Sequence, residues 1–175
     1  MKKTVVLCAA LTALPWAAAA CPADTRPRAP TTLLSVEGAN PAGVALDAAG
    51  LAALPQVSLV QRQTVSSSAS GASERSVTYA GVLLRDVLAR AGFGAPTDRG
   101  ARVGVIEAVA TDGYRAVFSW GELFNSSLGE QVLVISTQDG KALDAAAGPL
   151  ALRSLGDLRP GPRHVRNLCA LVVRR

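Results

Sequence analysis

The sequence predicts one domain of the α+β class, in which mixed sheets dominate and the helices are few and short. Strand-type and helix-type patterns alternate irregularly along the chain, which is typical of this class. No segment repeats with a period of about 20–50 residues, so a solenoid or propeller is excluded. Hydrophobic residues make up 49% of the 175 residues, which is enough for one core. We expect the domain to span residues 31–175, after a lead-in rich in Pro and Arg over residues 21–30.

The first twenty residues have the pattern of a secretory signal peptide. Two lysines follow Met1, and the apolar stretch over residues 4–14 is shorter than the ~20 residues that a transmembrane helix needs. A run of alanines then ends at Ala20, which gives a small-residue cleavage site before Cys21. No later segment is apolar for long enough to span a membrane. We therefore expect an exported protein, periplasmic or secreted, whose signal peptide is residues 1–20.

Two cysteines, Cys21 and Cys169, remain once the signal peptide is removed. In an exported protein such a pair most often forms a disulfide, and a bridge closing nearly the whole chain adds about 4–5 kcal/mol on the chain-entropy model. The alternative is a lipid anchor on Cys21, as in bacterial lipoproteins. Because Ala18 replaces the usual Leu three positions upstream, we expect the disulfide and keep lipidation as an alternative.

The charge pattern argues against a nucleic-acid partner. The formal net charge is +5, and it falls to +3 when the two signal-peptide lysines are removed. The mature chain then carries 15 Arg and a single Lys, Lys141. Such a bias toward Arg suits anion recognition, although a GC-rich genome produces the same composition. No basic run marks a nucleic-acid patch, and 4% aromatic residues supply few platforms for stacking bases.

The first half of the domain is expected to contain a strand, a helix and two further strands. Asp47 is a candidate N-cap for the helix, and Pro55 ends it. From residue 57 the side chains alternate as in a strand with one buried face. A run rich in Ser over residues 66–74 is expected to be a mobile connection. In order, the predicted elements are strand 31–38, helix 45–56, strand 57–65, the connection 66–74 and strand 75–81.

The second half opens with the clearest helical pattern in the chain. Leu84 and Leu88 share one face of this helix, and Gly92 supplies its C-terminal stop. The remaining segments are short and rich in β-branched residues, separated by Gly-containing turns. In order, the predicted elements are helix 82–93, strand 101–110, a turn at 111–113, strand 114–119, a short helix 120–124, strand 130–138, a turn at 139–140, strands 141–143 and 148–155, a loop 156–163 and a final strand 164–173.

The common catalytic signatures are absent from the sequence. His164 is the single histidine and no Cys-x-x-Cys pair occurs, so a multi-histidine metal site and a structural zinc site are excluded. Neither a Gly-x-Ser-x-Gly elbow nor a Walker phosphate loop occurs. A Ser–His–Asp triad through His164 lacks any supporting motif. The residues alone therefore indicate an exported α+β domain and no reaction.

Four phrases in order carry a resemblance to a known family. They are "VTYAGVLLRDVLARAGF", "ATDGYRAVFSWGEL", "VLVISTQDGKALDAAAGPLALR" and "RHVRNLCALVV". Together they resemble the oxidoreductase molybdopterin-binding domain, which has the sulfite-oxidase-like fold, in a short stand-alone bacterial form. The resemblance covers about residues 33–173.

The resemblance implies a molybdenum ion held by the dithiolene of a pterin and by one protein thiolate. In the family's enzymes that Cys precedes the Tyr-x-Gly-Val segment. Here the region reads "VSLVQRQTVSSSASGASERSV" and contains no Cys, and Gln61 stands about where the thiolate is expected. Neither Cys21 nor Cys169 matches the ligand position. We therefore predict no metal ligand and no catalytic residue, and molybdopterin stays an alternative cofactor.

The resemblance also implies a basic surface that grips the phosphate of the pterin. The candidate cofactor-binding residues are Arg153, Arg163, His164 and Arg166, with Gln61 and Arg62 as polar lining. Bidentate contacts between guanidinium and phosphate would be the mechanism. The family often has an aromatic residue where this chain has His164. Arg stems packed on a sheet explain the same residues without a ligand, so both interpretations stay open.

These observations predict an exported, periplasmic module that performs no redox chemistry. It would bind a small anionic or pterin-like ligand, or a periplasmic partner protein, where the related enzymes keep their cofactor. The alternative is a genuine molybdopterin-dependent oxidoreductase with an atypical metal shell. A third interpretation is a lipid-anchored interaction domain whose pocket has lost its function.

Overall fold

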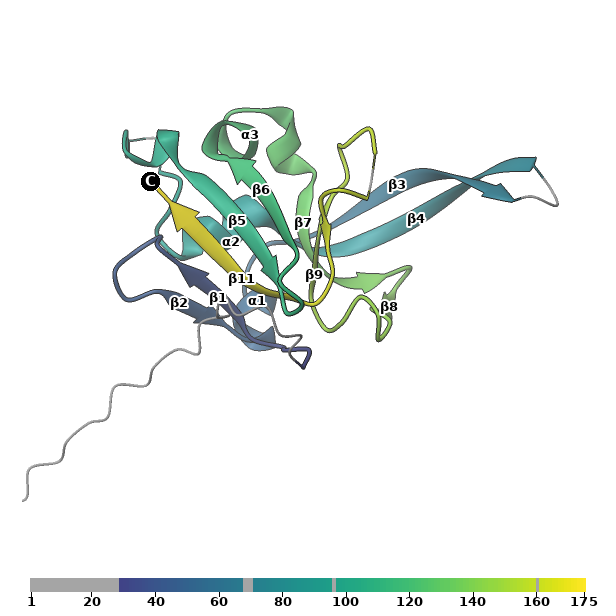
Figure 1. The fold of residues 1–175 in the computed structure, drawn as a ribbon, viewed down its shortest axis with the longest axis horizontal. Helices are drawn as coiled ribbons and strands as arrows, with labels where there is room; N and C mark the ends of the chain where they lie inside the picture. The colour runs from purple at the N-terminus through teal and green to yellow at the C-terminus, as the bar shows by residue number, and fades with distance from the viewer. Residues whose placement is uncertain (1–28, 68–70, 96, 160) are drawn as a thin grey trace, which may run out of the picture.

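Two β-sheets and a few short helices enclose the core of the domain (Figure 1). The computed structural model describes residues 29–67, 71–95, 97–159 and 161–175. The predicted signal peptide, residues 1–20, and the predicted disulfide or lipidation residue Cys21 lie outside the described residues. Within the described part of the chain, no helix is long and apolar enough to cross a membrane.

The first sheet joins the two ends of the described chain. Its strand order is β2-β1-β11-β5-β6. The pair β1 and β11 is parallel, and the other three pairs of neighbouring strands are antiparallel. The first and last strands of the domain therefore lie side by side at the centre of one sheet. The strands are β1 Leu34–Glu37, β2 Val44–Leu46, β5 Val105–Ala110, β6 Arg115–Ser119 and β11 Leu168–Arg174.

The second sheet carries the longest strands of the molecule. Its order is β10-β9-β7-β4-β3, with β8 paired to β7, and all its pairs are antiparallel. The β3–β4 hairpin extends well beyond the body of the domain (Figure 1). The strands are β3 Gln56–Ser67, β4 Gly71–Leu83, β7 Val132–Gln138, β8 Lys141–Ala142, β9 Ala151–Ser154 and β10 His164–Val165.

The helices are short, and each follows a strand: α1 follows β2, α2 follows β4 and α3 follows β6. Asp47 is the N-cap of α1 as predicted, because its carboxylate accepts a hydrogen bond of 2.8 Å from Gly50 N. Ser119 and Glu122 form a capping box at the start of α3. The helices are α1 Ala48–Ala52, α2 Leu84–Arg90 and α3 Trp120–Phe124, with 3₁₀ turns at Ala101–Val103 and Ser127–Glu130.

The main core lies between the inner faces of the two sheets and under α2. Leu84 and Leu88 of α2 are fully buried, as their helical spacing predicts, and each such side chain contributes about 1.5–3 kcal/mol. A smaller cluster lies on the opposite face of the second sheet and includes Tyr79 and Ile135. That second face is the one that carries the cleft described below.

Two sequence predictions are wrong in an instructive way. The predicted single strand 164–173 is two strands in different sheets, because Asn167 takes a left-handed conformation (φ 49°) between β10 and β11. The predicted mobile connection 66–74 lies largely within β3 and β4, which continue to Ser67 and resume at Gly71. Backbone pairing in a two-stranded ribbon does not depend on apolar side chains, so Ser and Thr are accommodated there. Residues 68–70 lie outside the described residues.

Candidate functional site

Two adjoining hollows form a cleft at the edge of the second sheet. They share Gly161, His164 and Arg166. The larger hollow has a volume of about 400 Å³ and the smaller about 300 Å³. The larger is lined additionally by Gln63, Tyr79, Ile135, Gln138, Leu143, Asp144, Ala146, Ala147 and Arg153. The smaller is lined additionally by Asp112 and Tyr114.

Arg153 is a buried cation at the floor of the larger hollow. Strand β9 alternates, so Leu152 enters the main core while Ala151 and Arg153 face the opposite side of the sheet. Only 7% of the Arg153 surface is exposed, and the guanidinium carbon lies 4.7 Å from the centre of the Tyr79 ring. Burial, opposed by Tyr79, lowers the Arg153 pKa from its ordinary value, and Arg166 lowers it further. Among the described residues no carboxylate forms an ion pair with this guanidinium.

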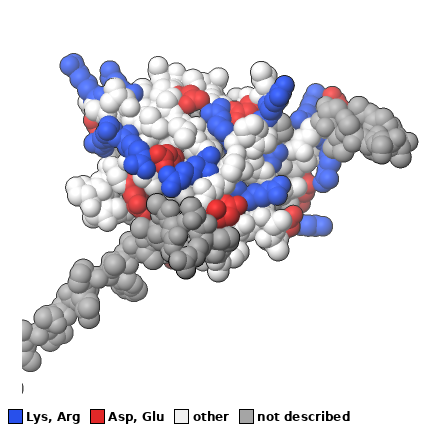
Figure 2. Space-filling model, viewed as in Figure 1, with Lys and Arg blue, Asp and Glu red and all other residues white. Residues whose placement is uncertain are grey.

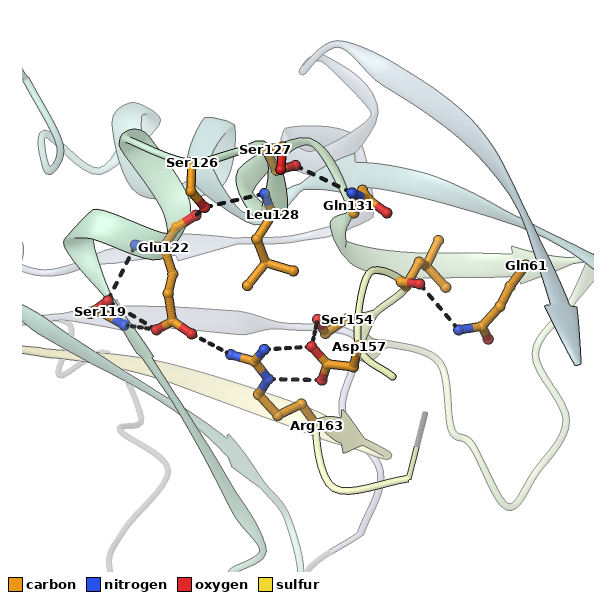
Figure 3. Close-up of polar contacts among 11 residues, drawn as sticks. Gln61, Ser119, Glu122, Ser126, Ser127, Leu128, Gln131, Ser154, Asp157 and Arg163 are labelled. Atoms are coloured by element: carbon orange, nitrogen blue, oxygen red, sulfur yellow. Dashed lines mark hydrogen bonds and ion pairs between the residues drawn. The ribbon is translucent and has the colours of Figure 1, made fainter. Parts of the chain in front are cut away.

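Gln61, on the edge strand β3, holds the guanidinium of Arg153, although β4 and β7 lie between β3 and β9 in the sheet order. Its side chain is 7% exposed, and Oε1 accepts hydrogen bonds from Arg153 Nε at 3.0 Å and from Gln63 Nε2 at 2.9 Å. Gln63 Nε2 also donates to the Tyr79 hydroxyl at 3.2 Å. The amide nitrogen of Gln61 points to the carbonyl of Leu155 at 3.5 Å (Figure 3). These contacts fix both ends of the Gln61 amide.

His164 stands opposite Arg153 in the register of β10 and β9. Its Nδ1 lies 2.9 Å from Arg153 Nη1, and because arginine only donates, Nδ1 is the acceptor. The proton of the neutral ring is therefore on Nε2, which has less than 1 Å² of exposed surface and no hydrogen-bond partner among the described residues. Burial, then Arg153 and Arg166, lower the pKa of His164 to about 4 against a weaker opposite effect of Asp144. The ring is neutral at physiological pH.

Arg163, although adjacent to His164 in sequence, does not line the cleft. Its guanidinium forms an ion pair with Asp157 and donates a hydrogen bond of 2.8 Å to Glu122 Oε1 (Figure 3). The guanidinium carbon also lies 4.7 Å from the centre of the Phe118 ring. Partial burial raises the Asp157 pKa, but hydrogen bonds from Arg163 and Ser154 outweigh it and hold that pKa below its ordinary value. Arg163 thus ties the loop before His164 to α3. A ligand-binding role for Arg163 is a prediction that nothing in this arrangement supports.

The other predicted residues divide between the cleft and the remaining surface. Arg166 is exposed and lines both hollows. Arg62 is exposed on the face of β3 opposite to Gln61, because neighbouring residues of a strand point to opposite faces. Cys169 is buried on β11 and takes part in a disulfide. Its predicted partner Cys21 lies outside the described residues, so that pairing stays a prediction.

Several lining residues were not among the sequence candidates. Gln63 shares the strand face of Gln61 two positions away, so the alternation of β3 could have revealed it. Asp112 and Tyr114 belong to the "DGY" phrase of the family resemblance, in which the sequence predicted a turn at 111–113 and a strand beginning at Tyr114. Figure 2 shows cationic and anionic side chains interspersed over one face of the molecule, so surface charge does not single out the cleft in that view.

The residues of the cleft fit an anion better than a thiolate-bound metal. No Cys lines either hollow, and the described residues contain no group of three or more His, Cys, Asp or Glu that could hold a metal ion. The amide oxygen of Gln61 already accepts two hydrogen bonds. Arg153 and Arg166 could hold the phosphate of a molybdopterin, whereas the thiolate that would complete a molybdenum shell has no counterpart here.

No protein-family model matches the chain, and no curated protein matches it. Among solved structures, it is similar to the sulfane dehydrogenase SoxCD from Paracoccus pantotrophus, with a TM-score of 0.61 and 18% sequence identity. The match covers 81% of this chain and 37% of that chain, so the protein spans little more than a third of its neighbour's length. At this identity the likeness shows the fold alone. It confirms the predicted fold class, in which β-sheets dominate and the helices are few and short.

Proposed function

We propose that this protein is an exported binding module that holds a small anionic or pterin-like ligand in the cleft and performs no redox chemistry at a thiolate-bound metal. The observation that carries the proposal is Arg153, a buried guanidinium whose side-chain partners are all neutral. A buried charge is costly unless an opposite charge accompanies it. An anionic ligand would supply that charge.

The charges of the larger hollow support an anion. Two guanidiniums, Arg153 and Arg166, line it together with one carboxylate, Asp144. Asp144 is exposed, and its Oδ1 accepts a hydrogen bond of 2.7 Å from Ala147 N, so it serves its own loop. The hollow therefore keeps an excess of positive charge beside the buried donor His164 Nε2.

The size and lining of the cleft suit a small organic anion. A volume of about 400 Å³ exceeds what one inorganic ion fills and lies within the ordinary range of small-molecule sites. The amides of Gln63 and Gln138 line the same hollow and provide both donors and acceptors. A ligand with an anionic group and a polar heterocyclic body, such as a pterin, matches this combination.

The proposal of a non-redox role rests on Gln61. This side chain occupies the region where the related enzymes are expected to carry their thiolate, and its amide is committed to Arg153, Gln63 and the Leu155 carbonyl. Ligand exchange from thiolate to amide would alter the metal's electronic properties. A binding role uses the same cleft without that metal.

The decisive experiment is native mass spectrometry with metal analysis of untagged protein purified from the periplasm. We expect an anionic ligand that is released on denaturation, without stoichiometric molybdenum. Arg153→Met should lose the ligand, whereas Arg62→Met, which changes an exposed Arg on the same sheet, should keep it. Stoichiometric molybdenum would overturn the non-redox role and favour the oxidoreductase alternative. Intact mass tests whether residues 1–20 have been removed, as export through a signal peptide requires. A cytoplasmic protein that keeps these residues would contradict export.

A further inference from the structure

We infer that Gln61 is a positioning residue that sets the ligand chemistry of the cleft. Its amide oxygen orients Arg153, and Arg153 holds His164 in the neutral form that carries its hydrogen on Nε2. This Nε2–H group then donates a hydrogen bond to an anionic oxygen of the ligand. The inference that an anion is bound rests on the proposed function. The relay from Gln61 to His164 does not, because it is built from contacts within the chain. The expected ligand group is a carboxylate or a phosphate-type oxoanion.

The first link is the hydrogen bond between Gln61 and Arg153. The amide oxygen is locked by two donors, Arg153 Nε at 3.0 Å and Gln63 Nε2 at 2.9 Å. An amide accepts these bonds without a charge of its own. A carboxylate in this place would also orient Arg153, but it would neutralise the guanidinium. Gln61 therefore positions the cation and leaves its charge for the ligand.

The second link is the hydrogen bond from Arg153 Nη1 to His164 Nδ1, at 2.9 Å. Five N–H groups and no acceptor make arginine a pure donor, so the Nδ1 lone pair must point at it. Protonation of Nδ1 would remove this bond and would place two cations in contact. The charged groups that face His164 are Arg153 from β9, Arg166 after β10, Asp144 before β9 and, in the smaller hollow, Asp112.

The third link is the unpartnered donor that this arrangement creates. With Nδ1 occupied, the only hydrogen of the neutral ring is on Nε2, which is buried and finds no acceptor among the described residues. A buried donor without a partner is unfavourable. Because less than 1 Å² of Nε2 is exposed, an oxygen of the ligand would satisfy this donor once a small shift of the ring opens Nε2 to the cleft. Arg153 has no acceptor, and the one acceptor of His164, Nδ1, is already occupied. This part of the cleft therefore offers only hydrogen-bond donors and selects a ligand group that only accepts hydrogen bonds.

The state of His164 distinguishes a positioning role of Gln61 from a purely structural one. If the amide only filled space in the sheet, its replacement would change stability and leave the protonated nitrogen of His164 where it is. If the amide acts through Arg153, the state of the His164 ring must follow the residue at position 61. The ring therefore reports directly on a side chain that it does not contact.

The test is the nitrogen NMR spectrum of His164, which is unambiguous because the chain contains one histidine. Untagged, ¹⁵N-labelled protein at pH 7 should show hydrogen on Nε2 and a lone pair on Nδ1. Gln61→Leu should give a mixture of both tautomers. Gln61→Glu should keep the Nε2–H form, since a carboxylate still orients Arg153. Arg62→Gln, on the other face of β3, is the matched control and should be indistinguishable from the wild type. Circular dichroism confirms that each variant is folded.

The same samples are then titrated with inorganic phosphate and, separately, with acetate, which distinguish an oxoanion site from a carboxylate site. We expect one of them to shift the Nε2 signal of the wild type, and its affinity to fall about tenfold or more in Gln61→Glu. Hydrogen on Nδ1 in the wild type, or an unchanged tautomer in Gln61→Leu, would overturn the relay even if phosphate binds. The predicted tautomer without a response to either anion would overturn the anion assignment and leave the relay standing.

Discussion

Replacement of Arg153 by methionine should weaken ligand binding strongly and leave the fold in place. Methionine keeps much of the length of the arginine stem and can pack against Tyr79 without a charge. The wild-type guanidinium gains about 1.5 kcal/mol from each of its hydrogen bonds to Gln61 and His164 and about 1–2 kcal/mol from the Tyr79 ring. Desolvation of the cation costs several kcal/mol and offsets these terms. We therefore expect the unfolding free energy of the ligand-free protein to change by about 1 kcal/mol or less.

The loss of binding should be much larger. A hydrogen bond to a charged group contributes about 1.5–3 kcal/mol, which corresponds to a dissociation constant about 10- to 150-fold weaker in the variant. At a ligand concentration one hundred times the wild-type Kd, bound ligand stabilises the wild type by about 2.7 kcal/mol. A thirtyfold weaker variant would gain only about 0.9 kcal/mol at that concentration.

Urea unfolding followed by circular dichroism measures both quantities, with and without the anion that the NMR titration identifies. Arg62→Met is the control and should show the full stabilisation by ligand. Equal stabilisation of Arg153→Met and wild type would refute the assignment of Arg153 to the ligand. If Arg153→Met fails to fold without ligand, the guanidinium is a structural group and the energetic reasoning above is wrong.

Three further changes test other parts of the structure. The pKa of His164 is about 4 in the folded protein, below its ordinary value of 6.5, so the unfolded chain binds more protons between these two pH values. Stability should fall as the pH is lowered from about 6.5 to 4, and a urea-unfolding series should show a smaller fall in His164→Gln; an equal fall would contradict a buried, neutral ring. Arg163→Ala should cost about 1–2 kcal/mol, since both of its acidic partners lose a hydrogen bond, and anion affinity should change less than in Arg153→Met. Gly81→Ala would place a Cβ 2.0 Å from Val134 O and should lower the thermal midpoint strongly, whereas Gly121→Ala in α3, with its nearest atom at 3.9 Å, should not.

The local structure could be predicted well because it depends on neighbouring residues. The alternation from Val57 to Arg62 predicts that Gln61 and Arg62 lie on opposite faces of β3, and in the structure Gln61 is buried and Arg62 is exposed. Arg62, which was also predicted as polar lining of the pocket, therefore lines neither hollow. The cap at Asp47 and the turn at Asp139-Gly140, where both residues have positive φ, follow from residue chemistry alone. The division of the chain between two sheets does not follow from residue chemistry, because an apolar strand has the same sequence pattern in either sheet.

The candidate site could be predicted only in part for the same reason. Arg163, His164 and Arg166 stand close together in sequence and look like one basic cluster. In the structure Arg163 turns to Asp157, while His164 meets Arg153 through the register of two short strands. The register of a strand depends on which strand it pairs with, and the sequence pattern of a single strand does not predict that partner. The turn at Asn167 that releases β10 from β11 is what allows His164 to face the cleft.

The contacts of Gln61 bear on whether the cleft is a remnant or a working site. In a site without function, nothing maintains a buried cation, because its desolvation is costly and an apolar side chain of similar size fills the same space. Here Gln63 locks Gln61, Gln61 orients Arg153, and Arg153 aligns His164, so that three successive hydrogen bonds end at an unsatisfied donor. An ordinary apolar side chain in place of each of these residues would remove the cost of desolvating a buried polar group. Their joint arrangement is explained most simply by an acceptor that enters the cleft, and the state of the single histidine makes that explanation measurable.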